Sequence, residues 1–185
     1  MASPEGKGIS FIMNLANITR LHNILASVSS MRRIIAIVED YSYKRSVFGK
    51  LLKEQPLHIV SFSKLKFITE GCLLLTMHLG KLQGICEWEK NKKDKIELLR
   101  ILLPLSKLFT AKMSIHVCSE GMECLGGNGY MENSYVPNIL RDSFVLSIWE
   151  GTTNVLALDF IRVYENNKNV VDYLFLIVER RIKQL

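Results

Sequence analysis

Long helical stripes constrain this chain more than any other feature of its sequence. Hydrophobic side chains recur every three or four residues through 12–43 and again through 57–89. This period puts them on one face of a helix, and stripes of such length are typical of antiparallel bundles. The first stripe consists of Ile18, Leu21, Leu25, Val28, Met31, Ile35 and Val38. The second stripe consists of Phe62, Leu65, Ile68, Cys72, Leu75, Leu79, Leu82 and Cys86.

A third long helix is predicted from about Lys95 to Gly121, after a loop at Lys90–Lys95. Pro104 lies inside it and predicts a kink or a local break. The inner face of this helix is predicted to consist of Leu98, Leu102, Leu105, Phe109, Met113 and Val117. Shorter helices are expected at 137–144, at about 154–163 and at 170–185. Since no segment alternates with period two, we predict an all-α fold, an up-down four-helix bundle with additional short helices.

The chain is predicted to have three parts. Residues 1–11 are interpreted as the end of a linker from a preceding domain, 12–165 as the bundle domain, and 166–185 as a C-terminal extension helix. The opening residues lack the positive start and apolar block of a signal peptide. We therefore expect the chain to begin partway through a larger protein.

Composition restricts the class of protein. A hydrophobic content of 48% favours a globular core over disorder, and no segment reaches the roughly 18 apolar residues of a membrane span. The four cysteines form no CxxC pair and no zinc-ligand spacing, so we predict no metal site and buried free thiols in a reducing compartment. The net charge of +6 is interpreted as an ordinary basic surface, with nucleic acid, an anionic membrane surface or a phosphorylated ligand as alternatives.

Four stretches together resemble the C-terminal domain of the acyl-CoA dehydrogenase family over about residues 5–165. They are Ile18-Thr19-Arg20, the segment from Tyr43 to Lys50, the segment from Leu125 to Tyr130, and Arg141-Asp142 followed by Ile148–Thr152. Each motif is weak alone, because Gly-Gly-Asn-Gly by itself indicates only a turn. The segment Met122–Gly127, the segment Ser147–Thr152 and Pro56 are most similar to the AidB-like branch of the family.

This resemblance implies a larger subunit, in which an N-terminal helical domain and a β-domain precede the bundle. FAD then lies between the β-domain and the bundle, and a neighbouring subunit's bundle completes the site in a homodimer or homotetramer. The implied reaction is α,β-dehydrogenation of an acyl-CoA thioester. A base removes the α proton while the β hydrogen leaves as hydride to the flavin.

Glu150 matches the family's catalytic base. Such a carboxylate needs an apolar, ligand-filled surrounding to take a proton near neutral pH. Trp149 is expected to supply an apolar wall for the substrate, and Gly151 lets the backbone approach it. The residue spacing alone favours another interpretation, a cap on the helix that begins at Thr152. Some branches place the base at the position of Thr19, and a threonine cannot act as one.

The resemblance assigns Arg20 and Arg45 to the site as well. Arg20 is expected to orient Glu150 or nearby loops through charge-assisted hydrogen bonds, with an exposed helical charge as the alternative. Arg45 matches an arginine that reaches the flavin diphosphate across the subunit interface, where its planar fork can bind two oxygens. Phe48 is expected to pack beside the adenine. The alternative for Arg45 is a solvated loop charge.

The glycine-rich segment is the remaining part of the implied flavin site. Gly126, Gly127 and Gly129 offer backbone N–H groups to an anion and match the loop that meets the partner subunit's flavin. Glu123 departs from straight-chain enzymes, which have glutamine there, and a carboxylate beside a diphosphate is unfavourable unless neutralised. Thr152 and Asn154 match positions that touch the diphosphate or adenine side, and helix capping is their alternative role.

Three functional hypotheses follow from the sequence. The first is the C-terminal domain of a flavin-dependent acyl-CoA dehydrogenase. The second is a non-catalytic, dimerising or regulatory helical module derived from that family. The third and weakest is a DNA-binding AidB-like fragment, suggested by the +6 charge. Acyl-chain length and compartment are not readable, although a mitochondrial or peroxisomal location is suspected if the source is eukaryotic.

Overall fold

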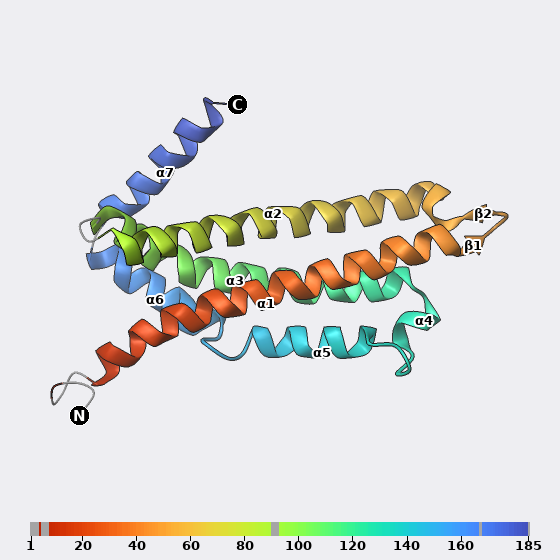
Figure 1. Cartoon of the computed structure of the whole chain (residues 1–185), viewed down its shortest axis with the longest axis horizontal. Coiled ribbons are helices and arrows are strands. Elements are labelled where there is room, and N and C mark those ends of the chain that lie inside the picture. Colours follow the sequence, from red (N-terminus) through yellow and green to blue (C-terminus); the bar gives the residue numbers. More distant parts are fainter. Residues whose placement is uncertain (1–3, 5–7, 90–92, 167, 185) are drawn as a thin grey trace.

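Helices dominate a computed structural model that describes residues 4, 8–89, 93–166 and 168–184. The first three helices are long and reverse direction in succession (Figure 1). They are α1 (Gly8–Lys44), α2 (Pro56–Trp88) and α3 (Lys93–Cys124). Helix α5 (Val136–Leu146) then runs back along α1 and α3. These four helices confirm the predicted up-down bundle.

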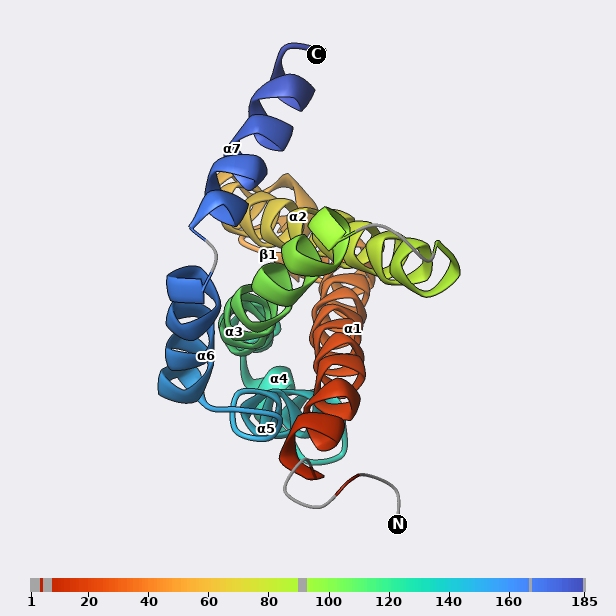
Figure 2. The ribbon, with the colours of Figure 1, turned by 90° about the vertical axis from the view of Figure 1, so that its left-hand side faces the viewer.

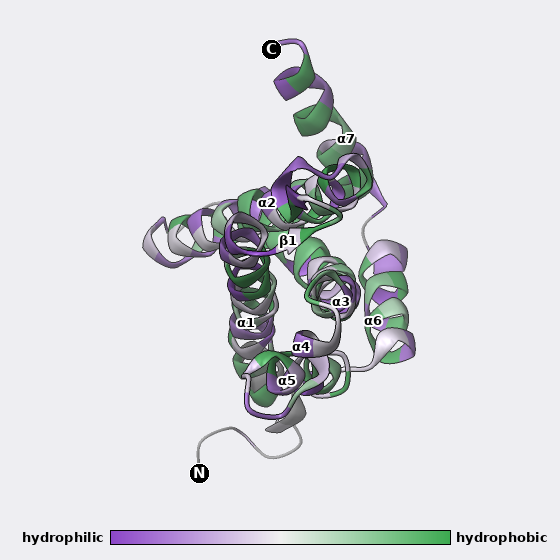
Figure 3. Ribbon diagram, turned by 90° about the vertical axis from the view of Figure 1, so that its right-hand side faces the viewer, coloured by the Kyte–Doolittle hydropathy of each residue, from purple (hydrophilic) through white to green (hydrophobic). Residues whose placement is uncertain are grey.

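Short elements lie around this bundle. They are β1 (Ser46–Val47), β2 (Lys50–Leu51), the 3-10 turn Leu52–Glu54, α4 (Gly127–Tyr130), α6 (Thr153–Asn166) and α7 (Asn169–Ile182). Helix α6 lies beside α3, and α7 projects from the bundle (Figure 2). Helix α7 carries both hydrophobic and hydrophilic residues along its length (Figure 3). The all-α prediction is confirmed, and the only addition among the described residues is the hairpin of β1 and β2, whose two-residue strands are too short to show alternation in the sequence.

Helix ends lie close to the predicted positions. Pro56 begins α2, as its fixed φ favours at a helix start. The predicted break at Pro104 does not occur, since α3 continues through this buried proline. Helix α1 already begins at Gly8 and α3 at Lys93, so the linker and loop predicted there are shorter than expected. Residues 1–3 and 5–7 of the predicted linker and 90–92 of the predicted loop lie outside the described residues.

The core is built mainly between α1, α2 and α3. From α1 it takes Ile24, Val28, Met31, Ile34, Ile35 and Val38. Three residues predicted on inner faces are exposed instead: Ile18, Leu25 and Phe109. The error on α1 has a physical cause, because the buried face of its N-terminal half is polar and contains Arg20, Asn23 and Ser27.

Helix α3 is the central helix and packs against α1, α2, α5, α6 and α7. By length and composition alone it could cross a membrane, but 56% of its most apolar window is buried within the protein. That burial is typical of a core helix. We predicted a single inner face for α3, but its central position buries residues on several sides of the helix.

Candidate active site and a second cavity

The turn between α5 and α6 presents Glu150 in an unusual backbone conformation. Glu150 has a φ of 60° and Gly151 has a φ of 112°, so two successive residues have positive φ angles. A side chain at Gly151 would meet Leu156 at 3.0 Å, and its φ disfavours any residue but glycine. Positive φ is uncommon for glutamate, and such strain clusters at functional sites.

The Glu150 carboxylate faces α1. Thr19 Oγ1 donates a hydrogen bond to Glu150 Oε2 at 2.7 Å. Within the described residues the carboxylate bonds α1 rather than the first turn of α6, which disfavours the capping alternative. Thr19 and Glu150, the two positions to which the resemblance assigns the base in different branches, therefore lie in direct contact.

A cavity of about 330 Å³ opens beside this carboxylate. Its lining consists of Thr19, His22, Asn23, Ala26, Trp149 and Glu150. Two residues predicted for chemistry and substrate contact, Glu150 and Trp149, therefore share one cavity. His22 was not predicted to contribute, and it also lines this space.

Arg20 is buried at the base of the turn and is only 4% exposed, which excludes the exposed-charge alternative. Its Nη1 contacts Asp159 Oδ2 at 2.6 Å, and its Nε donates to the Glu150 carbonyl oxygen at 3.4 Å. Arg100 binds both oxygens of Asp159 from the other side. Burial alone would raise the pKa of Asp159, but the hydrogen bonds from Arg100 and Arg20 outweigh it and lower this pKa.

Lys107 is a buried residue of the site that the sequence analysis missed. It is 1% exposed, and its Nζ donates to the Gly151 carbonyl oxygen at 2.5 Å. Burial, followed by the charge of Arg20, lowers the pKa of Lys107 to about 8. Asp159 was missed too. Lys107 and Asp159 are each a single charge within an otherwise apolar helical stretch. That contrast could have indicated a buried charge.

Because the pKa of Lys107 is lowered, we expect the free energy of unfolding to rise with pH. Because an unfolded lysine binds its proton up to about pH 10.4, the unfolded chain holds more protons than the folded one between about pH 8 and that value. We expect Lys107→Met to be at least as stable as the wild type at pH 7 and to lose this advantage by pH 9.5 in urea unfolding. An advantage that stays constant with pH would contradict this prediction.

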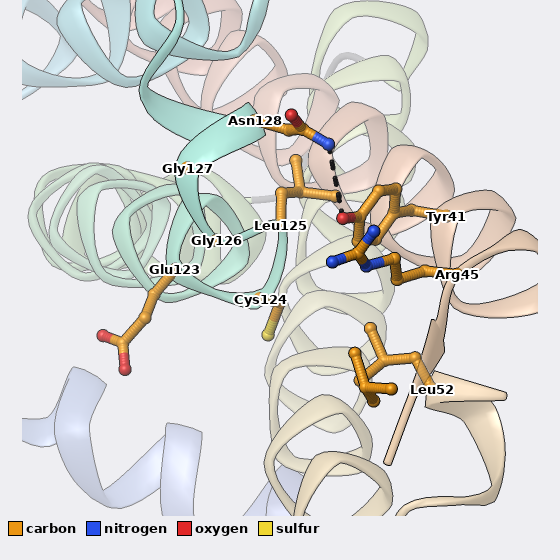
Figure 4. A pocket seen from close by; sticks show the side chains of 10 residues that line it. Tyr41, Arg45, Leu52, Glu123, Cys124, Leu125, Gly126, Gly127 and Asn128 are labelled. Carbon is orange, nitrogen blue, oxygen red and sulfur yellow. Dashed lines mark hydrogen bonds between the residues drawn. The ribbon is translucent and has the colours of Figure 1, made fainter. Parts of the chain in front are cut away.

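A second cavity of about 370 Å³ lies where α1, β1 and the end of α3 meet (Figure 4). Its lining includes Arg45, Glu123, Gly126 and Gly127, so four of the predicted cofactor residues come together. Asn128 Nδ2 donates to Tyr41 Oη at 3.3 Å across this space. The Glu123 carboxylate points away from the Arg45 guanidinium (Figure 4), which leaves the cation facing the cavity.

The other predicted cofactor residues lie elsewhere. Phe48 is 98% exposed at the tip of the hairpin, with φ 51°. Thr152 and Asn154 are exposed at the start of α6, and the Thr152 carbonyl accepts the Leu156 N–H, as the capping alternative expects. The adenine and diphosphate contacts of these three residues stay predictions.

The two cavities are far apart within one chain. Thr19 lines the first and Tyr41 the second, and the rise of α1 separates these positions by about 33 Å. A single chain thus carries two half-sites rather than one closed site.

This fold and these half-sites define a helical bundle domain of the kind found at the C-terminus of acyl-CoA dehydrogenases. The profile of the family described as "Acyl-CoA dehydrogenase, C-terminal domain" matches residues 6–164. The chain belongs to the acyl-CoA dehydrogenase family.

Several relatives support the same assignment. The chain is 42% identical over 181 residues to acyl-CoA dehydrogenase family member 11 of Caenorhabditis elegans, covering 98% of this chain and 29% of that protein. It is 34% identical over 171 residues to putative acyl-CoA dehydrogenase AidB of Escherichia coli, covering 92% of this chain and 31% of that protein. These identities confirm the predicted resemblance to the AidB-like branch.

A solved structure supports the same family assignment as these two relatives. The crystal structure of C. elegans ACDH-11 in complex with C11-CoA superposes with a TM-score of 0.90 at 42% identity, covering 98% of this chain and 30% of that one. This chain spans less than a third of the length of these curated relatives.

Proposed function

We propose that this domain serves a flavin-dependent acyl-CoA dehydrogenase and supplies its catalytic base, Glu150. The single observation that carries the proposal is the Glu150 carboxylate, which accepts a hydrogen bond from Thr19 at the edge of a cavity that Trp149 also lines. We call the polypeptide in which this chain follows the family's two preceding domains the complete subunit.

Glu150 would accept the α proton of the acyl thioester. Thr19 occupies Oε2 through its hydrogen bond, so Oε1 is the oxygen available to the substrate. As the α C–H bond breaks, its electron pair forms the Cα–Cβ double bond. FAD, when bound, accepts the β hydrogen as hydride. Trp149 lines one side of the cavity and would help to exclude water from the carboxylate once an acyl chain fills the space.

The second cavity fits an anionic part of a flavin nucleotide. Gly126 has φ 58°, and a Cβ on Gly126 or Gly127 would meet no atom within 4 Å, so open space borders this backbone. The Arg45 guanidinium lines the same space, and its planar fork suits a diphosphate. Arg45 and the two glycines would hold this group.

The distance between the cavities supports an assembly of two or more copies. Because about 33 Å separates the half-sites along α1, the Arg45 cavity cannot reach an acyl group beside Glu150 of its own chain. We propose that it meets the flavin of a neighbouring subunit in a homodimer or homotetramer. Sedimentation of the complete subunit tests this, and a strictly monomeric active enzyme would contradict it.

The activity itself is tested on the complete subunit. We expect purified protein to bind FAD and to oxidise C11-CoA, the ligand of the ACDH-11 complex, with an electron-accepting dye. Shorter and longer acyl-CoA thioesters then define the preferred chain length. A complete, flavin-loaded subunit that leaves every acyl-CoA unoxidised would favour the non-catalytic module instead.

Arg45→Ala is expected to weaken FAD binding to the complete subunit by about 10- to 100-fold. Charge-assisted hydrogen bonds contribute about 1.5–3 kcal/mol, and alanine removes them. The loss is measured by titrating the flavin-free protein with FAD. Arg33→Ala, which removes an exposed arginine from α1 outside this cavity, is the control. Unchanged affinity in Arg45→Ala would contradict the assignment.

A further inference from the structure

We infer that Lys107 is a positioning residue that holds the Glu150 turn in its reactive conformation through the carbonyl of Gly151. The inference rests on the proposed function and deepens it, because it concerns how this chain presents the base. Lys107 is not one of the residues that line the cavity. Within the described residues its hydrogen bond goes to the Gly151 carbonyl and not to the Glu150 carboxylate. Its action is therefore indirect.

Two cations from different helices hold two successive carbonyl groups of the turn. Arg20 of α1 donates to the Glu150 carbonyl at 3.4 Å, and Lys107 of α3 donates to the Gly151 carbonyl at 2.5 Å. The Arg20 bond is close to the limit of a hydrogen bond, and Arg20 is already engaged with Asp159 at 2.6 Å. Arg20 is therefore shared between this turn and Asp159, whereas the hydrogen bond of Lys107 goes to the turn alone within the described chain.

The turn needs such a restraint. Glu150 and Gly151 both have positive φ, and a glutamate released from this conformation would relax toward ordinary helical or extended φ. Rotation about the Glu150 backbone would carry its carboxylate away from Thr19 and from the cavity. The Gly151 carbonyl belongs to the Gly151–Thr152 peptide plane, which Lys107 holds, whereas Arg20 holds the Glu150–Gly151 plane. Together the two cations fix the backbone on both sides of Gly151.

A purely structural role does not account for a lysine at this position. Its ammonium group is almost fully buried, and its one hydrogen bond within the described chain is the bond to Gly151. The charge of Glu150 attracts this cation, but burial and the charge of Arg20 outweigh that attraction. Burying a cation with so little net compensation destabilises a fold, and an apolar side chain of similar length would fill the same space. A residue that opposes stability while fixing a strained turn is typical of a site built for function.

The test compares three variants of the flavin-loaded complete subunit. They are Lys107→Met, Lys64→Met as a control that changes an exposed lysine on α2, and Glu150→Gln as a marker of the proposed function. For each we would measure the thermal midpoint, the affinity for C11-CoA, and the rate constant of flavin reduction at saturating C11-CoA. Hydrogen exchange of the 147–153 segment in the 185-residue chain reports on the turn without any reaction.

We expect Lys107→Met to reduce the flavin about 10- to 100-fold more slowly, because misplacing a reacting group by about 1 Å has effects of that size. Its thermal midpoint should not fall, its affinity for C11-CoA should change little, and the 147–153 segment should exchange faster. Lys64→Met should resemble the wild type in every measurement. This combination of slower reaction with undiminished stability cannot come from a merely structural residue.

Several results would overturn the inference. They are a wild-type rate in folded, flavin-loaded Lys107→Met, unchanged hydrogen exchange of the turn, or a variant that unfolds or loses C11-CoA affinity together with its rate. The proposed function has a separate indicator, since a full rate in Glu150→Gln would refute the base assignment whatever Lys107→Met does.

Discussion

Replacing Glu150 by glutamine is expected to lower the rate constant of flavin reduction by C11-CoA about 10³-fold in the complete subunit. Glutamine has nearly the same shape, and its amide oxygen can still accept the hydrogen bond from Thr19. It cannot accept the α proton, so only the chemical step is affected. Rapid mixing with saturating C11-CoA and following the flavin absorbance gives this rate constant directly.

The control is Glu165→Gln, which changes an exposed acid on α6 and leaves the turn intact. Flavin content and C11-CoA affinity should be alike in both variants and in the wild type. Loss of a general base lowers a rate constant by at least about 10²-fold. If the rate constant of flavin reduction in Glu150→Gln were within about twofold of the wild-type value, Glu150 could not be the base.

Asp159→Ala is expected to destabilise the chain by about 3–5 kcal/mol. Asp159 is the counter-charge of the buried Arg20 and also binds Arg100, so its removal leaves a buried cation without a partner. The wild-type contribution has a defined pH dependence. Because the folded pKa of Asp159 is lowered, the contribution is present above the unfolded pKa of about 3.9 and is lost as the pH falls through the folded pKa.

Urea unfolding of the 185-residue chain at pH 7 measures this loss. Asp40→Ala is the matched control, since it removes an exposed ion pair with Lys44 and is expected to change stability by less than about 1 kcal/mol. Equal losses in the two variants would show that the Arg20–Asp159 pair contributes no more than a surface pair.

Most of the fold was predictable because hydrophobic period directly reports helices. The all-α class, the four-helix bundle and most helix ends followed from stripes in α1, α2 and α3. The predictions of which residues face inward were less reliable. Ile18 and Leu25 are exposed because Arg20 and Asn23 take the buried face of α1, and hydrophobicity alone cannot show that a polar residue is buried by an ion pair or a carbonyl.

The site was predictable only where a motif identified it. Glu150 and Trp149 share a cavity, and so do Arg45 and Gly126, as the resemblance led us to expect. Lys107 lies outside the quoted motifs, and its contact with Gly151 joins residues 44 positions apart.

Asp159 reaches Arg20 over 139 positions. Long-range pairings of this kind depend on how α3 and α6 pack, and local sequence patterns carry no information about that packing. The separation of the two half-sites along α1 likewise emerged only once the helices were placed.

Isotope exchange at the α carbon of C11-CoA tests the central claim most directly. The flavin-loaded complete subunit is incubated with C11-CoA in D₂O without an electron acceptor, and deuterium in the thioester is followed by mass spectrometry. The wild type should incorporate deuterium at the α carbon, whereas Glu150→Gln, with C11-CoA bound, should incorporate almost none. Exchange in Glu150→Gln at the wild-type rate would contradict the account, because another group would then remove the proton.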